Sequence, residues 1–234
     1  MDGGAIVAIV YAKSQSERVP GKNTRLLGGV PLFWHITATA NRTSCVDLVV
    51  VDTDCPQVAL HARQRGVRCV ARPAHLASNE ATGDDLVVHS AAMFPGAAVL
   101  LQLYPTSPFV SCGALTAAVL ACRDHNSATG ITSSKDYLWR GGRPATKVVP
   151  SQFLEPTVRE TTGFYATRRD YVVSHRRRVD PSSCFGVELP PIEAIDINYE
   201  DDWKFAEVVW NGLHWKGVCV SCPEREPVRC CNEL

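Results

Sequence analysis

The sequence has no excess of charge of either sign, because 24 Lys and Arg residues balance 24 Asp and Glu residues. A neutral chain has no long-range field for polyanions, so we expect no general binding to nucleic acid, and any anion site must be local. No apolar run approaches the length of a membrane span, and residues 1–4 (MDGG) lack the basic start of a signal peptide. These absences predict a cytoplasmic protein without a membrane partner.

Both common glycine-rich phosphate signatures are also missing, Gly-x4-Gly-Lys-Ser/Thr and Gly-x-Gly-x-x-Gly. Residues 5–11 (AIVAIVY) instead form an apolar run that is typical of a strand buried on both faces of a parallel sheet. The loop that follows carries lysines, an arginine, hydroxyl groups and a Pro-Gly turn. Because α/β sheets bind ligands at the carboxyl ends of their strands, this loop predicts a polyphosphate site. A solvated basic surface loop is the alternative.

Strand-like and helix-like segments alternate through the first half of the chain. Helices are expected over 31–43, 56–65, 82–93, 111–125, 168–175 and 200–211, and strands over 47–54, 67–71, 97–104, 163–167 and 195–197. This order predicts an α/β fold with a mainly parallel sheet between helical layers. The less regular interval 135–190 is expected to be an insertion or subdomain, because a chain of 234 residues seldom forms two cores.

Four separated motifs resemble one known family. They are residues 12–23 (AKSQSERVPGKN) followed by 27–32 (LGGVPL), 72–79 (RPAHLASN), 102–108 (QLYPTSP) and 194–203 (AIDINYEDDW), with a partial match at 159–165 (RETTGFY). The chain thereby resembles CMP-sialic acid synthetases, the acylneuraminate cytidylyltransferases, over nearly its whole length. The resemblance implies a three-layer Rossmann-like nucleotidyltransferase domain over residues 1–215, with a dimerisation subdomain near 135–190. Residues 216–234 form a Cys-rich tail outside the resemblance.

The resemblance also implies the reaction and its residues. A homodimer would join CTP to an acidic, sialic-acid-like sugar, giving a CMP-sugar and pyrophosphate. The implied nucleotide-binding residues are Ala12, Lys13, Ser14, Lys22, Asn23 and Arg72. Lys22 and Lys13 would neutralise phosphates, and Asn23 would orient the base. Lys22 is expected to lie in an exposed loop. The implied acceptor-binding residues are Gln102, Tyr104, Thr106 and Ser107. The implied catalytic residues are Lys22, Lys13 and Asp196. Asp196 would hold Mg²⁺ together with Asn198 from the same strand face.

Four positions depart from the family pattern. Lys13 replaces an Arg and lacks its bidentate fork, Tyr104 replaces a Gln, Thr162 replaces an Asn, and Asn198 replaces an Asp. An Asn carbonyl can coordinate a metal without adding charge, but Asn198 is equally suited to capping the next helix. Two alternatives therefore stay open: CMP transfer to another acid, such as a 3-deoxy-octulosonate or a phosphonate, or a catalytically weakened paralogue that binds nucleotide.

The chain has ten cysteines, which fall into two groups. Six are scattered through expected core segments and are interpreted as small buried hydrophobes in a reducing compartment. The other four, Cys219, Cys222, Cys230 and Cys231, could form a zinc site, although the adjacency of the last pair favours an unliganded tail. A zinc-stabilised interaction protein is a third hypothesis, but it leaves the four motifs unexplained. The basic run 175–178 (HRRR) is interpreted as a solvated helix end, and no role is assigned to His35, His75 or His89.

Overall fold

The computed structural model describes residues 3–146 and 148–215. The four tail cysteines of the predicted zinc site therefore lie outside the described residues. Among the residues that are described, no helix combines the length and the hydropathy needed to cross a membrane.

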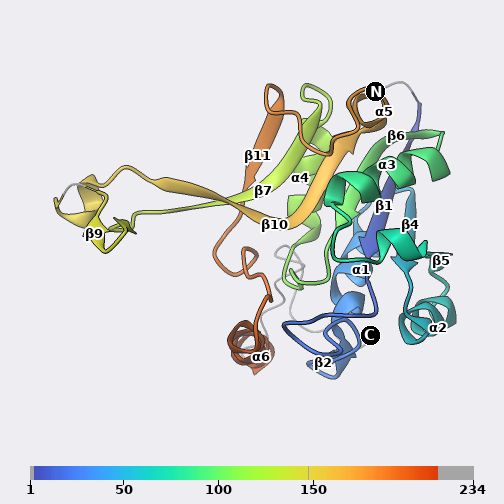
Figure 1. Cartoon of the computed structure of the whole chain (residues 1–234), viewed down its shortest axis with the longest axis horizontal. Helices are drawn as coiled ribbons and strands as arrows, with labels where there is room; N and C mark the ends of the chain where they lie inside the picture. The colour runs from blue at the N-terminus through green and yellow to red at the C-terminus, as the bar shows by residue number, and fades with distance from the viewer. Residues whose placement is uncertain (1–2, 147, 216–234) are drawn as a thin grey trace.

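A seven-stranded sheet forms the centre of the molecule (Figure 1). Its strands are β1 (Ala5–Tyr11), β4 (Leu48–Thr53), β5 (Arg68–Ala71), β6 (Ala97–Leu103), β7 (Ser127–Ser134), β10 (Thr157–Arg168) and β11 (Cys184–Glu188). Their order in space is β11-β7-β10-β6-β1-β4-β5. Only β10 runs antiparallel to its neighbours β6 and β7 among these strands, so the expected mainly parallel sheet is confirmed.

Helices cover both faces of the sheet. They are α1 (Leu32–Arg42), α2 (Pro56–Gln64), α3 (Gly83–Met93), α4 (Cys112–Ala121), α5 (Arg169–His175) and α6 (Glu200–Trp215). Alternate residues of β1 point to opposite faces. Ile6, Ala8 and Val10 pack with α1, α2 and α4, whereas Val7, Ile9 and Tyr11 pack with α3 and α5. The three-layer Rossmann-like α/β fold is thus confirmed.

The structure confirms the expected caps at the starts of two helices. Thr82 and Asp85 form the expected capping box at the start of α3, and the Ser111 hydroxyl accepts a hydrogen bond from the Ala114 amide at the start of α4. The polar strand β7 and the strand β11 were missed. The expected strand over 195–197 is wrong, because these residues form an extended segment outside the sheet. Helix α6 continues through Gly212 instead of ending there.

Helix α6 packs beside the hairpin β2 (Leu26–Leu27) and β3 (Val30–Pro31) rather than on the sheet (Figure 1). The fully buried Trp203 joins Leu27 and Ile197 in a separate apolar cluster. This packing holds the extended segment 195–199 across the loop that follows β1, and so brings the fourth motif to the first.

The interval 135–190 is divided in the structure. Residues 135–146 and 148–156, with the hairpin β8 (Trp139–Arg140) and β9 (Arg143–Pro144) and the 3-10 turn η2 (Ser151–Phe153), project away from the sheet as an arm (Figure 1). The second half of β10, together with β11, belongs to the main sheet instead. Large apolar side chains of the arm are exposed, with Trp139 at 65% and Phe153 at 70%.

The six described cysteines are free thiols. Only Cys122 is buried, and burial raises the pKa of its thiol to about 12. The interpretation of all six as buried hydrophobes therefore holds for Cys122, while the other five are partly exposed.

Candidate active site

A cavity of about 380 Å³ opens at the carboxyl ends of β1 and β6. The chain passes from β1 to β4 on one side, while β6 lies on the other side of β1. Such a reversal of strand order is where open α/β sheets form a ligand crevice. The predicted residues that line the cavity are Lys13, Lys22, Asn23, Arg72, Tyr104 and Thr106. The predicted residues outside its lining are Ala12, Ser14, Gln102, Ser107, Asp196 and Asn198.

Lys22 is buried, with 9% of its surface exposed, so the expectation of an exposed lysine is wrong. Its Nζ donates a hydrogen bond to the carbonyl oxygen of Ile197 at 2.9 Å. Burial lowers the pKa of the ammonium group, while the nearby carboxylate of Asp196 opposes that shift. An incoming phosphate would add negative charge and favour the protonated form, which suits Lys22 to an anion that arrives with the substrate.

Lys13 extends across the cavity mouth to the loop that follows β5. Its Nζ donates to Oδ1 of Asn79 at 2.5 Å, and Nδ2 of Asn79 donates to Oε1 of Glu17 at 2.5 Å. The two loops are therefore connected through one amide. The Glu17 carboxylate was not singled out from the sequence, and it places a negative charge in the loop predicted to bind phosphate.

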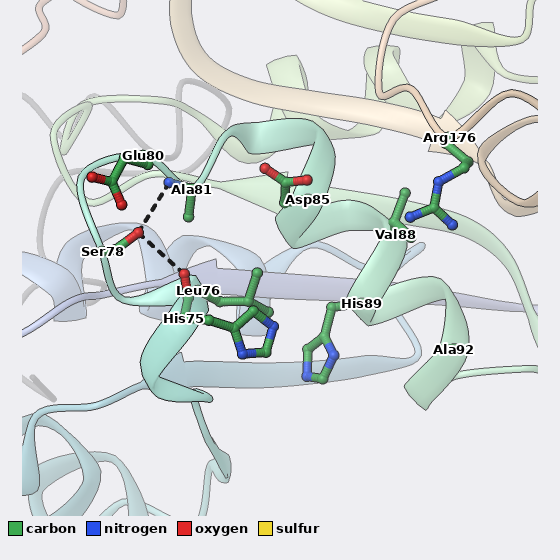
Figure 2. A pocket seen from close by; sticks show the side chains of 10 residues that line it. All are labelled: His75, Leu76, Ser78, Glu80, Ala81, Asp85, Val88, His89, Ala92 and Arg176. Atoms are coloured by element: carbon green, nitrogen blue, oxygen red, sulfur yellow. Dashed lines mark hydrogen bonds between the residues drawn. The ribbon is translucent and has the colours of Figure 1, made fainter.

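The loop around Asn79 is shaped by Ser78, and its other side borders a second hollow of about 490 Å³ (Figure 2). The Ser78 hydroxyl donates to the carbonyl of His75 at 3.1 Å and accepts from the amide of Ala81 at 3.3 Å. His75 and His89 both face this second hollow (Figure 2). Among the described residues, no group of three or more His, Cys, Asp and Glu could hold a metal ion.

Three of the predicted nucleotide-binding residues make contacts within the fold itself. Nδ2 of Asn23 donates to the carbonyl of Lys13 at 2.8 Å, which closes the loop after β1 on itself. The amide of Ser14 donates to Asp54 at 2.7 Å, and its hydroxyl donates to the same carboxylate. Partial burial would raise the pKa of Asp54, but these two hydrogen bonds hold it below its usual value. Ala12 is fully buried, and its backbone amide donates a hydrogen bond to the backbone carbonyl oxygen of Asp52.

Arg72 is paired with Asp52 beneath the cavity floor. Its Nε lies 2.6 Å from Oδ1 of Asp52, and the exposed fractions of the two side chains are 3% and 1%. The second oxygen of Asp52 is buried without a hydrogen-bond partner. The charge of Arg72 is therefore largely neutralised within the protein, and removing either partner would leave the other charge buried.

On the acceptor side, only Tyr104 and Thr106 reach the cavity. Gln102 is fully buried and donates through Nε2 to the carbonyl of Gly83 at 2.9 Å. Ser107 is 1% exposed, and its hydroxyl is packed so closely against Gly163 that a Cβ there would lie 2.7 Å away. Ser107 therefore packs against the bulge of β10, and its buried hydroxyl has no hydrogen-bond partner among the described residues.

Tyr104 is one of three packed tyrosines. Its ring centroid lies 5.9 Å from that of Tyr11 and 6.1 Å from that of Tyr165. Its hydroxyl accepts a hydrogen bond from Nη1 of Arg178 at 3.0 Å. Burial raises the pKa of Tyr104 although Arg178 acts in the opposite direction. Tyr104 therefore presents a neutral phenol to the cavity.

Asp196 and Asn198 lie side by side, on an extended segment rather than on the expected strand. Nδ2 of Asn198 lies 2.5 Å from Oδ2 of Asp196, which also accepts a hydrogen bond from Thr162 at 3.2 Å. Oδ1 of Asn198 accepts from Arg18 at 2.9 Å. The alternative that Asn198 caps α6 is wrong, because its side-chain amide contacts Arg18 and Asp196 instead of the first amides of the helix.

The donor set fits Mg²⁺ only through Asp196. Its Oδ1 is buried without a hydrogen-bond partner, so one hard anionic oxygen is available. The carbonyl oxygen of Asn198 is already engaged by Arg18. A magnesium ion here would therefore have one protein carboxylate and would take its other ligands from water and phosphate.

Two features of the site were missed by sequence reasoning. Thr162 adopts a left-handed φ of 58° at a bulge in β10, where its hydroxyl reaches Asp196. Arg178, interpreted as part of a solvated run, is packed against Tyr104 and Tyr165. The left-handed conformation of Thr162 has no signal in its own residue type, because β-branched residues disfavour it, and nothing local distinguishes Arg178 from its neighbours.

The comparisons with known proteins agree with this geometry. A family model described as cytidylyltransferase matches residues 7–178. The chain is 28% identical over 224 residues to a CMP-N,N'-diacetyllegionaminic acid synthase from Legionella pneumophila, which covers 86% of this chain and 94% of the relative. It is 26% identical to a 3-deoxy-manno-octulosonate cytidylyltransferase from Synechococcus elongatus, over 74% of this chain and 78% of the relative. An N-acylneuraminate cytidylyltransferase A from Danio rerio is 22% identical over 86% of this chain and 50% of the relative.

Solved structures share the fold. A CMP:2-keto-3-deoxy-manno-octonic acid synthetase complexed with CTP superposes with a TM-score of 0.67 at 18% identity, over 89% of this chain and 99% of the other. A 4-diphosphocytidyl-2C-methyl-D-erythritol synthase from Anaerococcus prevotii gives 0.65 at 16% identity, over 89% and 96%. At these identities the likeness establishes the architecture.

Proposed function

This chain belongs to the cytidylyltransferase family, whose model spans residues 7–178, and from that membership we propose that it transfers CMP from CTP to a sialic-acid-like nonulosonic acid. The enzyme is a nucleotidyltransferase, and its relatives confirm the resemblance drawn from the sequence motifs. The observation that carries the choice of acceptor is the similarity to the diacetyllegionaminic acid synthase, which extends over 94% of that relative.

The residues of the cavity suit nucleotidyl transfer. In this reaction a sugar hydroxyl attacks the α-phosphorus of CTP and loses its proton to solvent, and its oxygen forms the new P–O bond. The bond between the α-phosphorus and the oxygen that bridges to the β-phosphate breaks, so pyrophosphate leaves with that oxygen. Lys22 and Lys13 line the cavity and would neutralise charge on the triphosphate and on the leaving pyrophosphate. The backbone of the loop 12–23, held by Asn23 and Ser14, would position the nucleotide. Tyr104 and Thr106 would border the acceptor.

Magnesium stays a prediction. Asp196 is the residue that would hold it, through the oxygen that has no hydrogen-bond partner among the described residues. The ion would supply positive charge to the phosphate oxygens. Arg18, Thr162 and Asn198 keep the other side of the Asp196 carboxylate in place.

A second acceptor class has its own support. The chain is similar to 3-deoxy-manno-octulosonate cytidylyltransferases, and it shares the fold of a synthetase for the corresponding acid. The phenol of Tyr104 stands where the CMP-sialic acid synthetase pattern has an amide, and this favours a different set of hydrogen bonds to the sugar. A catalytically weakened paralogue is favoured by one observation, the single available carboxylate at Asp196.

A homodimer and a cytoplasmic location also stay predictions. Support for the dimer comes from the arm over residues 135–146 and 148–156, which exposes Trp139, Phe153 and Val148, the last at 86%. Apolar side chains on a projecting element are better explained by a second copy of the chain than by solvent. The arm would then exchange contacts with its counterpart across a two-fold axis.

The deciding experiment is pyrophosphate release. CTP, UTP, ATP and GTP should each be incubated with a nonulosonic acid and with 3-deoxy-octulosonate in the presence of Mg²⁺. We expect release with CTP and the nonulosonic acid. Release only with 3-deoxy-octulosonate would select the second acceptor class, and nucleotide binding without release from any pair would select the weakened paralogue.

A further inference from the structure

Arg178 is set apart from the arginines beside it. Arg176 and Arg177 are exposed, whereas only 28% of the Arg178 side chain is accessible. Arg176 reaches the second hollow beside α3 (Figure 2). The guanidinium of Arg178 instead stacks over the ring of Tyr165 at 4.0 Å and donates through Nη1 to the hydroxyl of Tyr104 at 3.0 Å.

Space for Arg178 is created by a glycine at the start of α3. A Cβ at Gly83 would lie 2.0 Å from Nη1 of Arg178 and 2.9 Å from the hydroxyl of Tyr104. The start of a helix also carries a positive partial charge, which does not attract the guanidinium but favours an anion bound beside it. Gly83 thus leaves room for the guanidinium, while Tyr104, just after β6, and Tyr165 of β10 hold it in place. The guanidinium lies one hydrogen bond beyond the cavity, whose lining includes Tyr104.

This guanidinium lacks a bidentate carboxylate among the residues that the structure describes. The nearest is Asp84, whose Oδ1 lies 4.0 Å from Nε, and that same oxygen accepts the backbone amide of Arg178 at 2.9 Å. By contrast, Arg72 is closely paired with Asp52 at 2.6 Å. A planar guanidinium has five donors and matches a carboxylate through two parallel hydrogen bonds.

We propose that Arg178 binds the carboxylate of the acid that accepts CMP. This inference rests on the proposed function, because it assigns a residue to the acceptor of that reaction. Stacking on Tyr165 and the hydrogen bond to Tyr104 hold the fork in place, so little side-chain freedom is lost on binding. Tyr104, where the family has an amide, then serves as the support of this arginine as well as the border of the acceptor site.

The test compares Arg178→Met with Arg178→Lys and with the matched control Arg177→Ala. Methionine keeps an apolar stem against Tyr165 but removes the charge. We expect Arg178→Met to raise the KM for the acid roughly tenfold to hundredfold, with the KM for CTP within about twofold of wild type. Arg178→Lys should have a KM for the acid between those of wild type and Arg178→Met, because lysine keeps the charge without the bidentate fork. Arg177→Ala should behave as wild type.

An acceptor analogue with a carboxamide in place of the carboxylate separates binding from a general structural effect. Wild type should prefer the acid by roughly tenfold or more, and Arg178→Met should lose that preference. A retained preference, or an equal rise of both KM values, would overturn the inference. Calorimetry of the acid and the carboxamide with wild type and Arg178→Met reads the same preference without turnover. Because this binding measurement needs no CTP, it tests Arg178 even if CTP proves not to be the nucleotide substrate.

Discussion

The amide of Asn198 bridges two charged side chains, with Nδ2 at 2.5 Å from Oδ2 of Asp196 and Oδ1 accepting from Arg18 at 2.9 Å. An arginine only donates and a carboxylate only accepts, so this orientation of the amide satisfies both partners. The site therefore holds Asp196 in position without a metal. An aspartate at 198 would instead place two carboxylates side by side.

Asn198→Asp should make the protein depend on Mg²⁺ for stability. In EDTA we expect a loss of about 1–2 kcal/mol from carboxylate repulsion, which lowers Tm by roughly 3–6 °C. Adding Mg²⁺ should restore Tm in the variant and leave wild type nearly unchanged, as thermal unfolding at several concentrations would show. Turnover should also require less Mg²⁺. Identical magnesium titrations of the two proteins would remove position 198 from any metal site, and Asn198→Ala serves as the control for loss of the bridge alone.

The nucleotide preference is a second prediction. The protein should bind CTP at least roughly tenfold more tightly than UTP, ATP or GTP, because it belongs to the cytidylyltransferase family and its first motif shapes the nucleotide loop. Calorimetry with the four nucleotides under one magnesium concentration measures this. Equal affinity for all four would contradict the cytidine assignment while leaving the fold unaffected.

The arm should control assembly. Phe153→Asp places a charge among exposed apolar side chains, so it should convert a dimer to monomer if the arm forms the interface. Sedimentation velocity of wild type and variant at equal concentration gives the answer. The matched control is Val208→Asp, which places the same charge on the exposed face of α6, where Val208 is 69% accessible. A wild-type monomer, or a dimer that survives Phe153→Asp, would place assembly elsewhere.

Thr162 is strained by its left-handed backbone. A β-branched residue at a φ of 58° is unfavourable, whereas Asn adopts this conformation more readily. Thr162→Asn should therefore raise the free energy of unfolding by about 1 kcal/mol. Urea unfolding compares it with Thr162→Ala, which loses the hydrogen bond to Asp196 without gaining the preference of Asn for this conformation. Equal stability of both variants would show that the backbone there carries no strain.

Much of the fold could be predicted from local pattern, because buried parallel strands such as β1 are continuous apolar runs and the caps at Thr82 and Ser111 are short-range signals. The polar strand β7 has no such pattern, since its fit depends on β10 and β11 on either side. The candidate site also combines parts that have a local sequence signal with parts that depend on distant residues. The loop after β1 was located from sequence, but the burial of Lys22 depends on a segment 175 residues away, and the position of Arg178 depends on Tyr104, which is 74 residues away.

The protonation state of Lys22 should change when a triphosphate binds. Burial lowers the pKa of its ammonium group in the free protein, so the folded state binds fewer protons than the unfolded state at pH values between the lowered pKa and the ordinary value of 10.5. Its contribution to stability is therefore least favourable at lower pH, where the buried ammonium is charged, and improves as pH rises through that window. Binding of a triphosphate should reverse the shift, since phosphate charge favours the ammonium form.

CTP binding at alkaline pH should accordingly take up a fraction of a proton, which calorimetry in buffers of different ionisation enthalpy measures. Lys22→Arg should abolish the uptake, because a guanidinium stays charged throughout this range. Lys22→Ala is a poorer probe, since it also removes the hydrogen bond to Ile197 and should cost about 1 kcal/mol of stability. Lys13→Arg is the matched control, because it leaves Lys22 in place and should keep the uptake. If proton uptake were the same in Lys22→Arg and wild type, another group would be responsible, and Lys22 would serve mainly to hold the segment 195–199 over the nucleotide loop.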